Sequence, residues 1–445
     1  MKKNLVSLMS LTLLVGLVSL TSCKKENTLG NGTQFRATVE DCTSLNGKTA
    51  LDGFNLNWVA GDQIAIYGTA GAGIYSATPQ TPATVAVFDN VSGSTGDGPF
   101  RAFYPSTLTT DGVNITLPTT QTYVEGSINE FPMYAESNDN QLAFKNLCGV
   151  LKLDLTKANI NISTITITAD AEICGDFSVD FTGGTPSLRY VGNGLNAVTL
   201  SCATPQSITN GKVFYITLPA TFTSVRNITL NSDDGRFCEK AVKSTSQVTV
   251  QRNTITTVTF GDDDMVFVRG ISGNGITNYT MLPTYCSYNF SYSQQLILNS
   301  EMSGEAVITG IDFYYMSNGT VSRNVDVYMA NTTNTTLNYD FVPYDNTAFQ
   351  QVFSGRMTFH TGWSHIEFST PFTYDGTSNI VITVNDHTFT YSSGCNFRVH
   401  TAYGLARSNY RDSYAFDPAT PTTIGSGYSL GYRNDMRLYY DDNAK

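Results

Sequence analysis

GVLKLDL, residues 149–155, alternates apolar and polar side chains with a period of two. In an extended chain Leu151, Leu153 and Leu155 fall on one side, and Lys152 falls between them on the other. This pattern predicts a β-strand with one face toward a core and the other toward solvent. We interpret the stretch as the first strand of a β-sandwich.

The same period of two recurs along the chain on both sides of this strand. Residues 55–68, NLNWVAGDQIAIYG, place Trp58 before a Gly-Asp turn, and Ile64 and Ile66 on a common face after it. In VNITLPTTQ the alternation places Val113, Ile115 and Leu117 on one side. Other segments of this kind are STITITA (163–169), VFYITLPA (213–220), NITLNSDDGRF (227–237) and TVQRNTITTVTF (249–260). No long segment repeats apolar residues at helical spacing, so the sequence predicts an all-β protein.

The composition divides the chain into about three domains. Residues 24–34 are polar and contain glycine, as a tether does. Gly261 to Asp264 form a polar break, and 18 of the 25 tyrosines, all four histidines and Trp363 lie beyond it. The predicted division is a signal peptide (1–22), a tether (23–34), a first sandwich (35–145), a second sandwich (146–260), a linker (261–270) and a tyrosine-rich sandwich (271–445).

The N-terminus has the pattern of an export signal. Lys2 and Lys3 precede an apolar run that ends near Leu20, which is too short to span a bilayer. The sequence Leu-Thr-Ser-Cys that ends at Cys23 resembles a bacterial lipoprotein signal, in which this cysteine is acylated. An ordinary cleaved signal is the alternative. A lipid on Cys23 would attach the chain to a membrane surface.

Charge and cysteine content exclude two classes of protein. The formal net charge is −11 and no basic cluster follows the tether, so nucleic acid is not expected as a partner. Beyond Cys23 an odd number of cysteines remains, which excludes a complete disulfide framework. These are Cys42, Cys148, Cys174, Cys202, Cys238, Cys286 and Cys395. Cys286 and Cys395 are the two that could pair within the last domain.

An ordered set of motifs resembles the fimbrillin-like proteins of Gram-negative bacteria, the type V pilins and their relatives. The set is FRATVED (35–41), KTALDG (48–53), the W-x-x-G-D-x-I-x-I-Y of residues 58–67, FRAFYPS (100–106), ITLPTTQTYV (115–124), PMYAES (132–137) and FKNLCGVLKLDL (144–155). The resemblance implies two tandem transthyretin-like β-sandwiches and export as a lipoprotein to the outer membrane. It also implies removal of an N-terminal strand by an Arg- or Lys-specific protease, after which another subunit donates a strand. Arg36 stands where such a cleavage would fall; the alternative is an ordinary polar residue in the first strand.

Residues 262–445 fall outside that resemblance and are similar to a jelly-roll-like module found at the ends of surface proteins in the same bacteria. The segments that carry this similarity are FSYSQQLILNSEM (290–302), RNVDVYMANT (323–332), FSGRMTF (353–359), GWSHIEFSTPFTYDGTSNIVITVND (362–386) and YRNDMRLYY (432–440). A domain at this end would hinder donation of a C-terminal strand. The expectation is therefore a tip subunit or a fixed surface adhesin rather than a shaft subunit.

The catalytic motifs that we tested each lack a partner group. Residues 46–49, NGKT, end like a phosphate loop without its first glycine, and GYSLG at 427–431 has no histidine after it in the chain. We read both as turns. His360 and His365 flank a turn signal, Thr-Gly-Trp-Ser, but no metal-binding motif accompanies them. Asp262 to Asp264 lack the spacing of a calcium loop. We expect no enzyme activity, cofactor or metal.

Aromatic surface is the remaining functional signal. Tyr288, Phe290 and Tyr292 alternate with polar residues, and we expect these rings to fill a core. Trp363, beside His360 and His365, is instead a candidate for stacking on a sugar ring.

A second candidate loop has Tyr403, Tyr410 and Tyr414, interleaved with Arg407, Arg411 and Asp412. The predicted function is a surface-exposed lipoprotein adhesin of the outer membrane, as a fimbrial tip or accessory subunit whose last domain binds a host or microbial glycan or glycoprotein. Two alternatives remain open: a glycan-capture lipoprotein that does not polymerise, and a fimbrial anchor subunit.

Overall fold

The computed structural model describes residues 34–40, 43–44, 56–128, 131–242, 247–345, 347–420 and 424–441. Within these ranges the regular elements are β-strands in several sheets and the short 3-10 helices η1(Thr182–Gly184), η2(Asp262–Asp264) and η3(Asn299–Glu301). The all-β prediction is therefore confirmed. No helix of the described part is long and apolar enough to cross a membrane. Cys23, Cys42 and the NGKT stretch lie outside the described residues.

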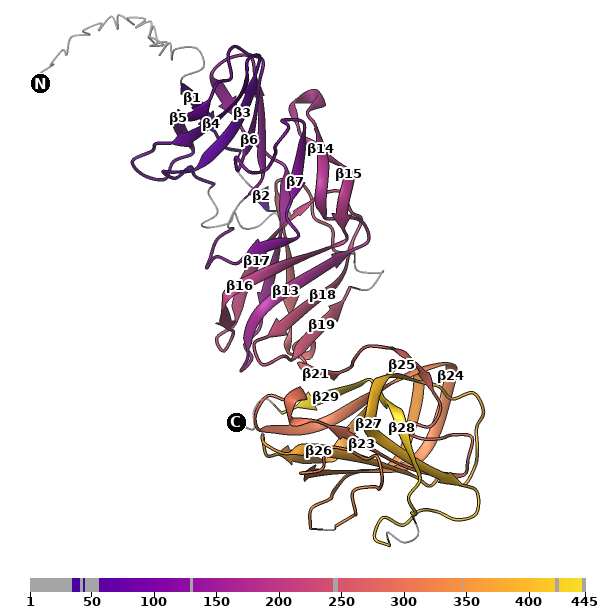
Figure 1. Cartoon of the computed structure of the whole chain (residues 1–445). Helices are drawn as coiled ribbons and strands as arrows, with labels where there is room; N and C mark the ends of the chain where they lie inside the picture. The colour runs from indigo at the N-terminus through magenta and orange to yellow at the C-terminus, as the bar shows by residue number, and fades with distance from the viewer. Residues whose placement is uncertain are drawn as a thin grey trace, which may run out of the picture.

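Eight strands form the N-terminal sheet, drawn in indigo in Figure 1. Their order is β10(Gln141–Ala143), β1(Gln34–Thr38), β5(Val85–Gly93), β4(Gly71–Ala77), β3(Gln63–Gly68), β6(Phe100–Tyr104), β9(Met133–Ser137) and β11(Lys145–Asn146). Trp58, Ile64 and Ile66 are fully buried in its core, as their alternation predicted.

Strand β1 lies inside this sheet rather than at its edge. It pairs parallel with β10 and antiparallel with β5. Phe35 is fully buried, and its ring makes edge-to-face contacts with Tyr75 and Phe100 at centroid distances of 4.9 Å. Arg36 points to the exposed face, and its backbone N–H donates to the carbonyl of Asn140 at 2.9 Å. The strand is thus held by both neighbours and by an aromatic anchor.

The middle sandwich encloses an aliphatic core between two sheets. One sheet has the order β17(Lys212–Pro219), β12(Cys148–Leu155), β20(Thr254–Phe260) and β2(Thr43–Ser44). The other has β19(Phe237–Ala241), β18(Val225–Ser232), β13(Asn161–Ala169) and β16(Ala197–Ser207). Leu151, Leu153 and Leu155 of β12 are buried in this core, whereas Lys152 is only half-buried. The alternation that predicted the strand is confirmed residue by residue.

Two strands of the 35–145 range join strands from beyond residue 146. The strand β7(Asn114–Leu117) pairs with β14(Cys174–Asp180), which also pairs with β15(Ser187–Leu195). The strand β8(Thr120–Thr122) pairs with β16. The chain therefore crosses between the two ranges before residue 145. Ile115 and Leu117 are buried on one face of β7, as predicted. The prediction is wrong for Val113, which is 51% exposed because the Asp111 carboxylate accepts from the Val113 and Asn114 N–H groups in a turn.

The C-terminal sandwich is built around two long strands, β24(Ala306–Thr332) and β25(Gln350–Tyr374), which pair with each other through bulges. Its other strands are β21(Val268–Ile271), β22(Thr277–Tyr279), β23(Phe290–Ile297), β26(Asn379–Asp386), β27(Phe397–Arg411), β28(Tyr428–Asn434) and β29(Met436–Tyr440). All eight residues of β23 are buried. Phe290 and Tyr292 lie in a core, as predicted, but Tyr288 precedes the strand and is half-buried.

A narrow junction links the middle and C-terminal sandwiches. Val268 of β21 pairs with Phe237 of β19, and β29 then pairs antiparallel with β21. The Arg269 guanidinium donates to the carbonyl of Asp234, and Arg437 donates to Glu239 at 2.8 Å. One sheet therefore continues from the middle sandwich into the C-terminal sandwich (Figure 1).

Candidate ligand-binding surfaces

The turn expected around Trp363 does not form. Residues 360–365 all lie within β25, where Gly362 has a positive φ of 97° and bends the strand. His360 pairs with Thr320 and His365 with Asp312, so the two histidines occupy one strand and do not meet across a hairpin. The turn signal of Thr-Gly-Trp-Ser therefore marks a bend and a bulge within a long strand.

Cations cover the Trp363 ring. The Arg437 guanidinium lies 4.3 Å from the ring centroid and that of Arg398 lies 5.0 Å from it. Tyr314 makes an edge-to-face contact with the same ring at 5.2 Å. Because Arg437 also binds Glu239 of the middle sandwich, Trp363 lies beside the junction. Its half-buried ring has little free face for a sugar.

His365 lies between two carboxylates. Its Nδ1 is 2.7 Å from Asp312 and its Nε2 is 2.8 Å from Glu367, while the Tyr439 hydroxyl donates to the other Asp312 oxygen at 2.8 Å. The hydrogen bond to Asp312 raises the pKa of His365, with a smaller contribution from Glu367 and against the effect of burial. His360 is exposed and contacts the carbonyl of Thr361. This geometry stabilises the protonated form of His365.

The second candidate group occupies a strand rather than a loop. Tyr403 and Tyr410 lie in β27, and Tyr414 follows its end. Tyr403 is 83% exposed and Tyr414 is 57% exposed. One face of the Tyr414 ring is covered by Arg411, whose guanidinium lies 3.6 Å from the ring centroid. Arg407 is buried and binds the carbonyls of residues 337, 338 and 426, so it is a structural residue.

Four aromatic rings form what we call the tyrosine cluster: Tyr285, Tyr288, Tyr410 and Tyr428. Tyr410 is at its centre, with ring centroids 4.8 Å from Tyr285, 4.3 Å from Tyr288 and 5.6 Å from Tyr428. The planes of Tyr410 and Tyr428 are stacked at 19°, and Tyr428 is 54% exposed. The cluster joins the segment before β23 with β27 and β28. Tyr428 is the exposed member, and the other three rings are half-buried.

The chemistry of the cluster favours binding over catalysis. Burial raises the pKa of Tyr410, with the hydroxyl of Tyr428 as the next cause, so at neutral pH this ring stays a neutral phenol. Neutral phenols donate and accept hydrogen bonds and stack on the apolar face of a sugar. The sequence indicated Tyr410 but gave no reason to add Tyr285 or Tyr428, because their contacts arise from strand pairing.

A buried Asp435–His400 pair is the nearest approach to a catalytic arrangement in the described residues. His400 Nδ1 lies 2.8 Å from Asp435, and its Nε2 lies 3.1 Å from the Arg433 guanidinium. Because arginine only donates, Nε2 accepts and the Nδ1 proton faces Asp435. Arg433 occupies the place that a nucleophile needs, so the pair cannot activate a hydroxyl or thiol.

Ser429 of the GYSLG motif lies in strand β28, which corrects our reading of this stretch as a turn. A nucleophile elbow would also place the serine on a sharp turn between a strand and a helix, and this strand provides none. Among the described residues no group of three histidine, cysteine, aspartate or glutamate side chains is placed to hold a metal ion. Asp264, of the acidic break, instead accepts from Lys240 and from the N–H of Gly261.

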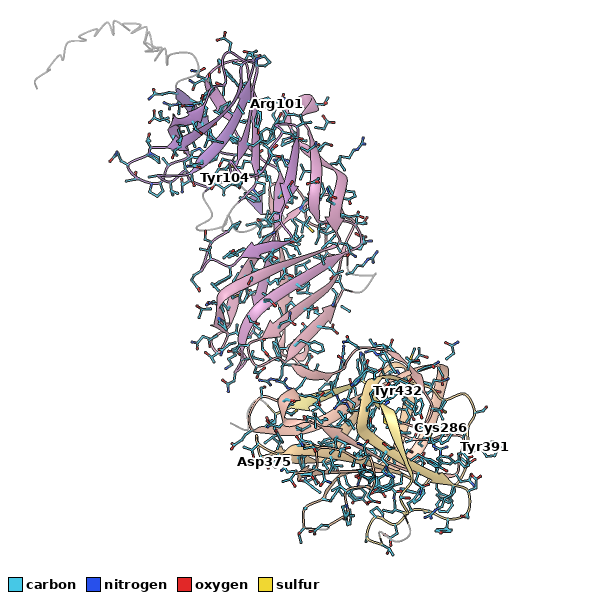
Figure 2. All side chains as sticks on the ribbon, viewed as in Figure 1. Arg101, Tyr104, Cys286, Asp375, Tyr391 and Tyr432 are labelled. Carbon is cyan, nitrogen blue, oxygen red and sulfur yellow. The ribbon has the colours of Figure 1, made fainter. Side chains whose placement is uncertain are left out.

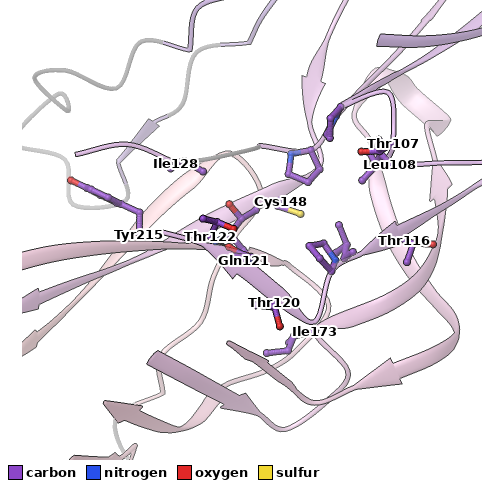
Figure 3. Close-up of a pocket in the computed structure, with 15 residues that line it drawn as sticks. Thr107, Leu108, Thr116, Thr120, Gln121, Thr122, Ile128, Cys148, Ile173 and Tyr215 are labelled. Atoms are coloured by element: carbon purple, nitrogen blue, oxygen red, sulfur yellow. Dashed lines mark hydrogen bonds between the residues drawn. The ribbon is translucent and has the colours of Figure 1, made fainter. Parts of the chain in front are cut away.

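A cavity of about 360 Å³ lies between β7 and β8 on one side and β12 and β17 on the other (Figure 3). The Gln121 side chain binds both backbone groups of Thr217 there, at 2.6 and 2.9 Å, and so occupies part of the β17 edge. Burial raises the pKa of the Cys148 thiol, which keeps it protonated and unreactive. The cavity contains no activated nucleophile.

No family model and no curated protein matches the sequence. Among solved structures, a "putative cell adhesion protein" of Bacteroides uniformis is 17% identical with a TM-score of 0.32, over 52% of this chain and 94% of that one. A fimbrial protein of Bacteroides ovatus is 9% identical with a TM-score of 0.27, over 70% and 69%. The tip fimbrial protein Mfa3 of Porphyromonas gingivalis is 11% identical with a TM-score of 0.19, over 47% and 81%. The chain is thus similar to adhesion and fimbrial proteins at low identity, and likenesses at these TM-scores do not determine what it binds.

Proposed function

We propose that the chain is a lipid-anchored adhesin of the outer membrane, in which the N-terminal sheet and the middle sandwich carry the C-terminal sandwich as a binding head. The tyrosine cluster is the observation that carries this proposal. Stacked rings with hydroxyl edges suit a carbohydrate, which presents apolar C–H faces and many hydroxyl groups. Binding, without catalysis and without a cofactor or nucleic acid, is the function that follows.

Within the head, the tyrosine cluster is the first candidate site. Tyr428 and Tyr410 supply the stacked pair, and the exposed rings of Tyr403, in β27, and Tyr414, after its end, are further candidates. Trp363, with His360 and His365, stays a second candidate. Its ring is half-buried under Arg437 and Arg398, so we rank it below the cluster.

A glycan array tests the binding proposal. The soluble chain from residue 24 onward should bind a subset of glycans, and Tyr428→Ala should weaken that binding about tenfold, which corresponds to about 1.4 kcal/mol. Tyr339→Ala removes a more exposed ring from outside the cluster and should leave binding unchanged. Trp363→Ala distinguishes the second site: if it alone abolishes binding, the tyrosine cluster is not the site. If the chain binds no glycan, the proposal is wrong for both candidate sites.

We further propose that the chain is a fimbrial tip or accessory subunit that receives a strand from another subunit. The position of β1 supports this. Cleavage after Arg36 would remove Phe35 from the core and leave an exposed part of the β5 and β10 edges, which a strand from another subunit could fill. Since β1 is hydrogen-bonded on both sides, it resists proteolysis until it is released, and cleavage would then be coupled to assembly.

The N-terminus of the mature protein from native cells, measured by mass spectrometry, decides between the assembly models. A chain that begins at acylated Cys23 retains β1, which favours a fixed glycan-capture lipoprotein or an anchor subunit. A chain that begins at Ala37 has lost Phe35 and Arg36, which supports strand exchange with other subunits. Any other start would contradict processing at Arg36.

A further inference from the structure

Cys286 and Cys395 meet inside the C-terminal sandwich although 108 residues separate them in the chain. Both are buried in the same core cluster, and their side chains are within hydrogen-bonding contact. The hydroxyl of Thr284 lies 3.4 Å from the Cys286 sulfur. The N–H of Ser392, close to Cys395 in the chain, donates to the Cys286 carbonyl at 2.7 Å. The backbones on the two sides are therefore fixed against each other as well.

Cys395 lies near the end of a segment, residues 387–396, that we call the aromatic loop. Phe389 and Tyr391 of this loop are among the most exposed large side chains of the described residues. Phe389 has a φ of +64°, which is unfavourable for a bulky residue and persists only where the surroundings impose it. Its ring packs edge-to-face on Phe290 at 4.9 Å. Figure 2 shows Cys286 and Tyr391 on the same side of the C-terminal sandwich.

Cys286 lies in the segment that carries Tyr285 and Tyr288 of the tyrosine cluster. Arg323 connects this segment with the aromatic loop, because its guanidinium donates to the Tyr288 carbonyl at 2.9 Å and to the Thr390 carbonyl at 2.7 Å. A covalent bond between Cys286 and Cys395 would thus join two segments that already bind one cation. The other described cysteines, Cys148, Cys174, Cys202 and Cys238, lie in earlier parts of the chain.

We propose that Cys286 and Cys395 form a disulfide after export, and that this bond fixes the aromatic loop against the segment carrying Tyr285 and Tyr288. The proposal rests on the proposed function only in requiring export to an oxidising compartment. The cysteine pair would then be a covalent link between the aromatic loop and the tyrosine cluster.

The oxidation is a thiol–disulfide exchange with an exported protein thiol oxidase as the oxidant. The Cys395 thiolate attacks the disulfide of the oxidase and forms a mixed disulfide. The Cys286 thiolate then attacks the Cys395 sulfur and displaces the oxidase. Two electrons pass to the oxidase, which leaves with two thiols, and the two protein thiols lose their protons. Because both cysteines are buried in the folded chain, the exchange takes place during folding.

In the folded chain the two sulfurs have different environments. A hydrogen bond from Cys286 lowers the pKa of the Cys395 thiol, and the Tyr315 hydroxyl and the Arg323 cation act in the same direction against burial. The same contact raises the pKa of Cys286, together with burial. By contrast, burial raises the pKa of Cys202 to about 11 and that of Cys238 to about 12, so these two remain thiols.

Peptide mapping of the exported chain, purified without reductant and alkylated on unfolding, tests the bond. The expected result is a linked pair of peptides containing Cys286 and Cys395, lighter by two hydrogen atoms than the reduced pair, while Cys148 and Cys238 are alkylated. Alkylation of both Cys286 and Cys395, or linkage of either to another cysteine, would overturn the proposal. This readout does not depend on any ligand, so it is separate from the test of adhesion.

Hydrogen exchange tests the clamp. A chain reduced under denaturing conditions and refolded in reductant should exchange at least tenfold faster in the aromatic loop than the linked chain, with the peptides of β12 unchanged. The Cys286→Ala/Cys395→Ala variant should show the same fast exchange with or without reductant. If the linked wild-type chain exchanges equally before and after reduction, the bond does not fix the loop and that part of the proposal is wrong.

Discussion

The middle and C-terminal sandwiches are both all-β, but their interiors differ. The core of the middle sandwich is mostly aliphatic, with Leu153 of one sheet packed in the same cluster as Ile165 and Ile228 of the other. The C-terminal sandwich instead buries ion pairs. Arg323 and Asp386 are both fully buried with Nε 2.7 Å from a carboxylate oxygen, and Arg433 binds Glu301 from within the core.

This difference follows from what covers each sheet. In the C-terminal sandwich the strand β23 has a core on either face. On one face Phe290, Tyr292 and Leu296 pack with residues from loops outside the sheet, such as Leu337 and Phe341, and on the other face Ile297 joins the main core. Long loops bring backbone carbonyls and charged side chains inside, where buried partners must satisfy them. Both sandwiches have a large apolar core, and the C-terminal sandwich adds specific polar contacts such as the fully buried Arg323–Asp386 pair.

The largest expected effect comes from breaking a buried ion pair. Arg323→Met leaves Asp386 buried without its cation and should cost about 3–5 kcal/mol at neutral pH. Burial raises the pKa of Asp386, so the loss should shrink at acidic pH, where this carboxyl is protonated. Hydrogen exchange in β24 and β26 measures it. The double variant Arg323→Met/Asp386→Leu should recover much of the loss; a double variant as unstable as the single would show that packing, not charge, is responsible.

Truncation of an aliphatic side chain should also destabilise the protein, but in the middle sandwich and without a strong dependence on pH. Leu153→Ala removes buried area from the central strand β12 and should cost about 2–5 kcal/mol. Exchange in β12, β17 and β20 should accelerate while the C-terminal sandwich stays protected. Leu153→Met is the matched control and should cost less than about 1.5 kcal/mol. A loss that depended on pH as strongly as that of Arg323→Met would contradict the contrast between the two interiors.

A smaller effect is expected where the two sandwiches meet. Arg269 is buried and donates to the carbonyls of Asp234 and Glu301, so Arg269→Ala leaves acceptors unpaired at a cost of about 1–3 kcal/mol. The connection between β20 and β21 should then be cleaved faster in limited proteolysis, with both sandwiches otherwise intact. Arg356→Ala, on the exposed face of β25, should not change the cleavage rate. Equal cleavage rates for the two variants would show that Arg269 does not stabilise the junction.

The smallest effect is a pH dependence at His365. Its pKa is raised in the folded chain, so its contribution to stability is complete below the ordinary value near 6.5 and is lost as the pH rises through the raised value. The partial exposure of His365 limits this contribution to less than about 1 kcal/mol. Urea unfolding of the C-terminal sandwich across this pH range should show the decline, and His365→Gln should flatten it. His360→Gln should not, since His360 has no carboxylate partner among the described residues; if it flattens the profile equally, Asp312 is not the cause.

The sequence predicted the middle sandwich well because its strands have one covered and one open face. Leu151, Leu153 and Leu155 obey a period of two, and the structure buries each of them. Val113 broke the pattern because a local side chain, Asp111, bound its backbone and drew it into a turn. Local chemistry of this kind overrides alternation at strand ends.

The C-terminal sandwich was less predictable for a physical reason. Loops on one face of β23 and the main core on the other remove the alternation, and the bend at Gly362 gives β25 the sequence signal of a turn. The tyrosine cluster depends on the pairing of β23, β27 and β28, so a single member, Tyr410, was identified. Trp363 was predicted to stack on a sugar ring. The guanidinium groups that cover its ring come from Arg398 and Arg437, which are distant in sequence, so the sequence did not reveal them.

The pairing of β21 with β29 has a consequence for how such heads diversify. The C-terminal sandwich is entered by β21, and its last strand returns to the same edge, at the upper left of that body in Figure 1. Cys286 and Tyr391 lie toward its right in Figure 2. Because the first and last strands of this sandwich lie at one edge, it can be joined to a different domain if one set of contacts, those around Arg269 and Arg437, is replaced. Recombination would then exchange the C-terminal sandwich while the middle sandwich and the N-terminal sheet stay unchanged.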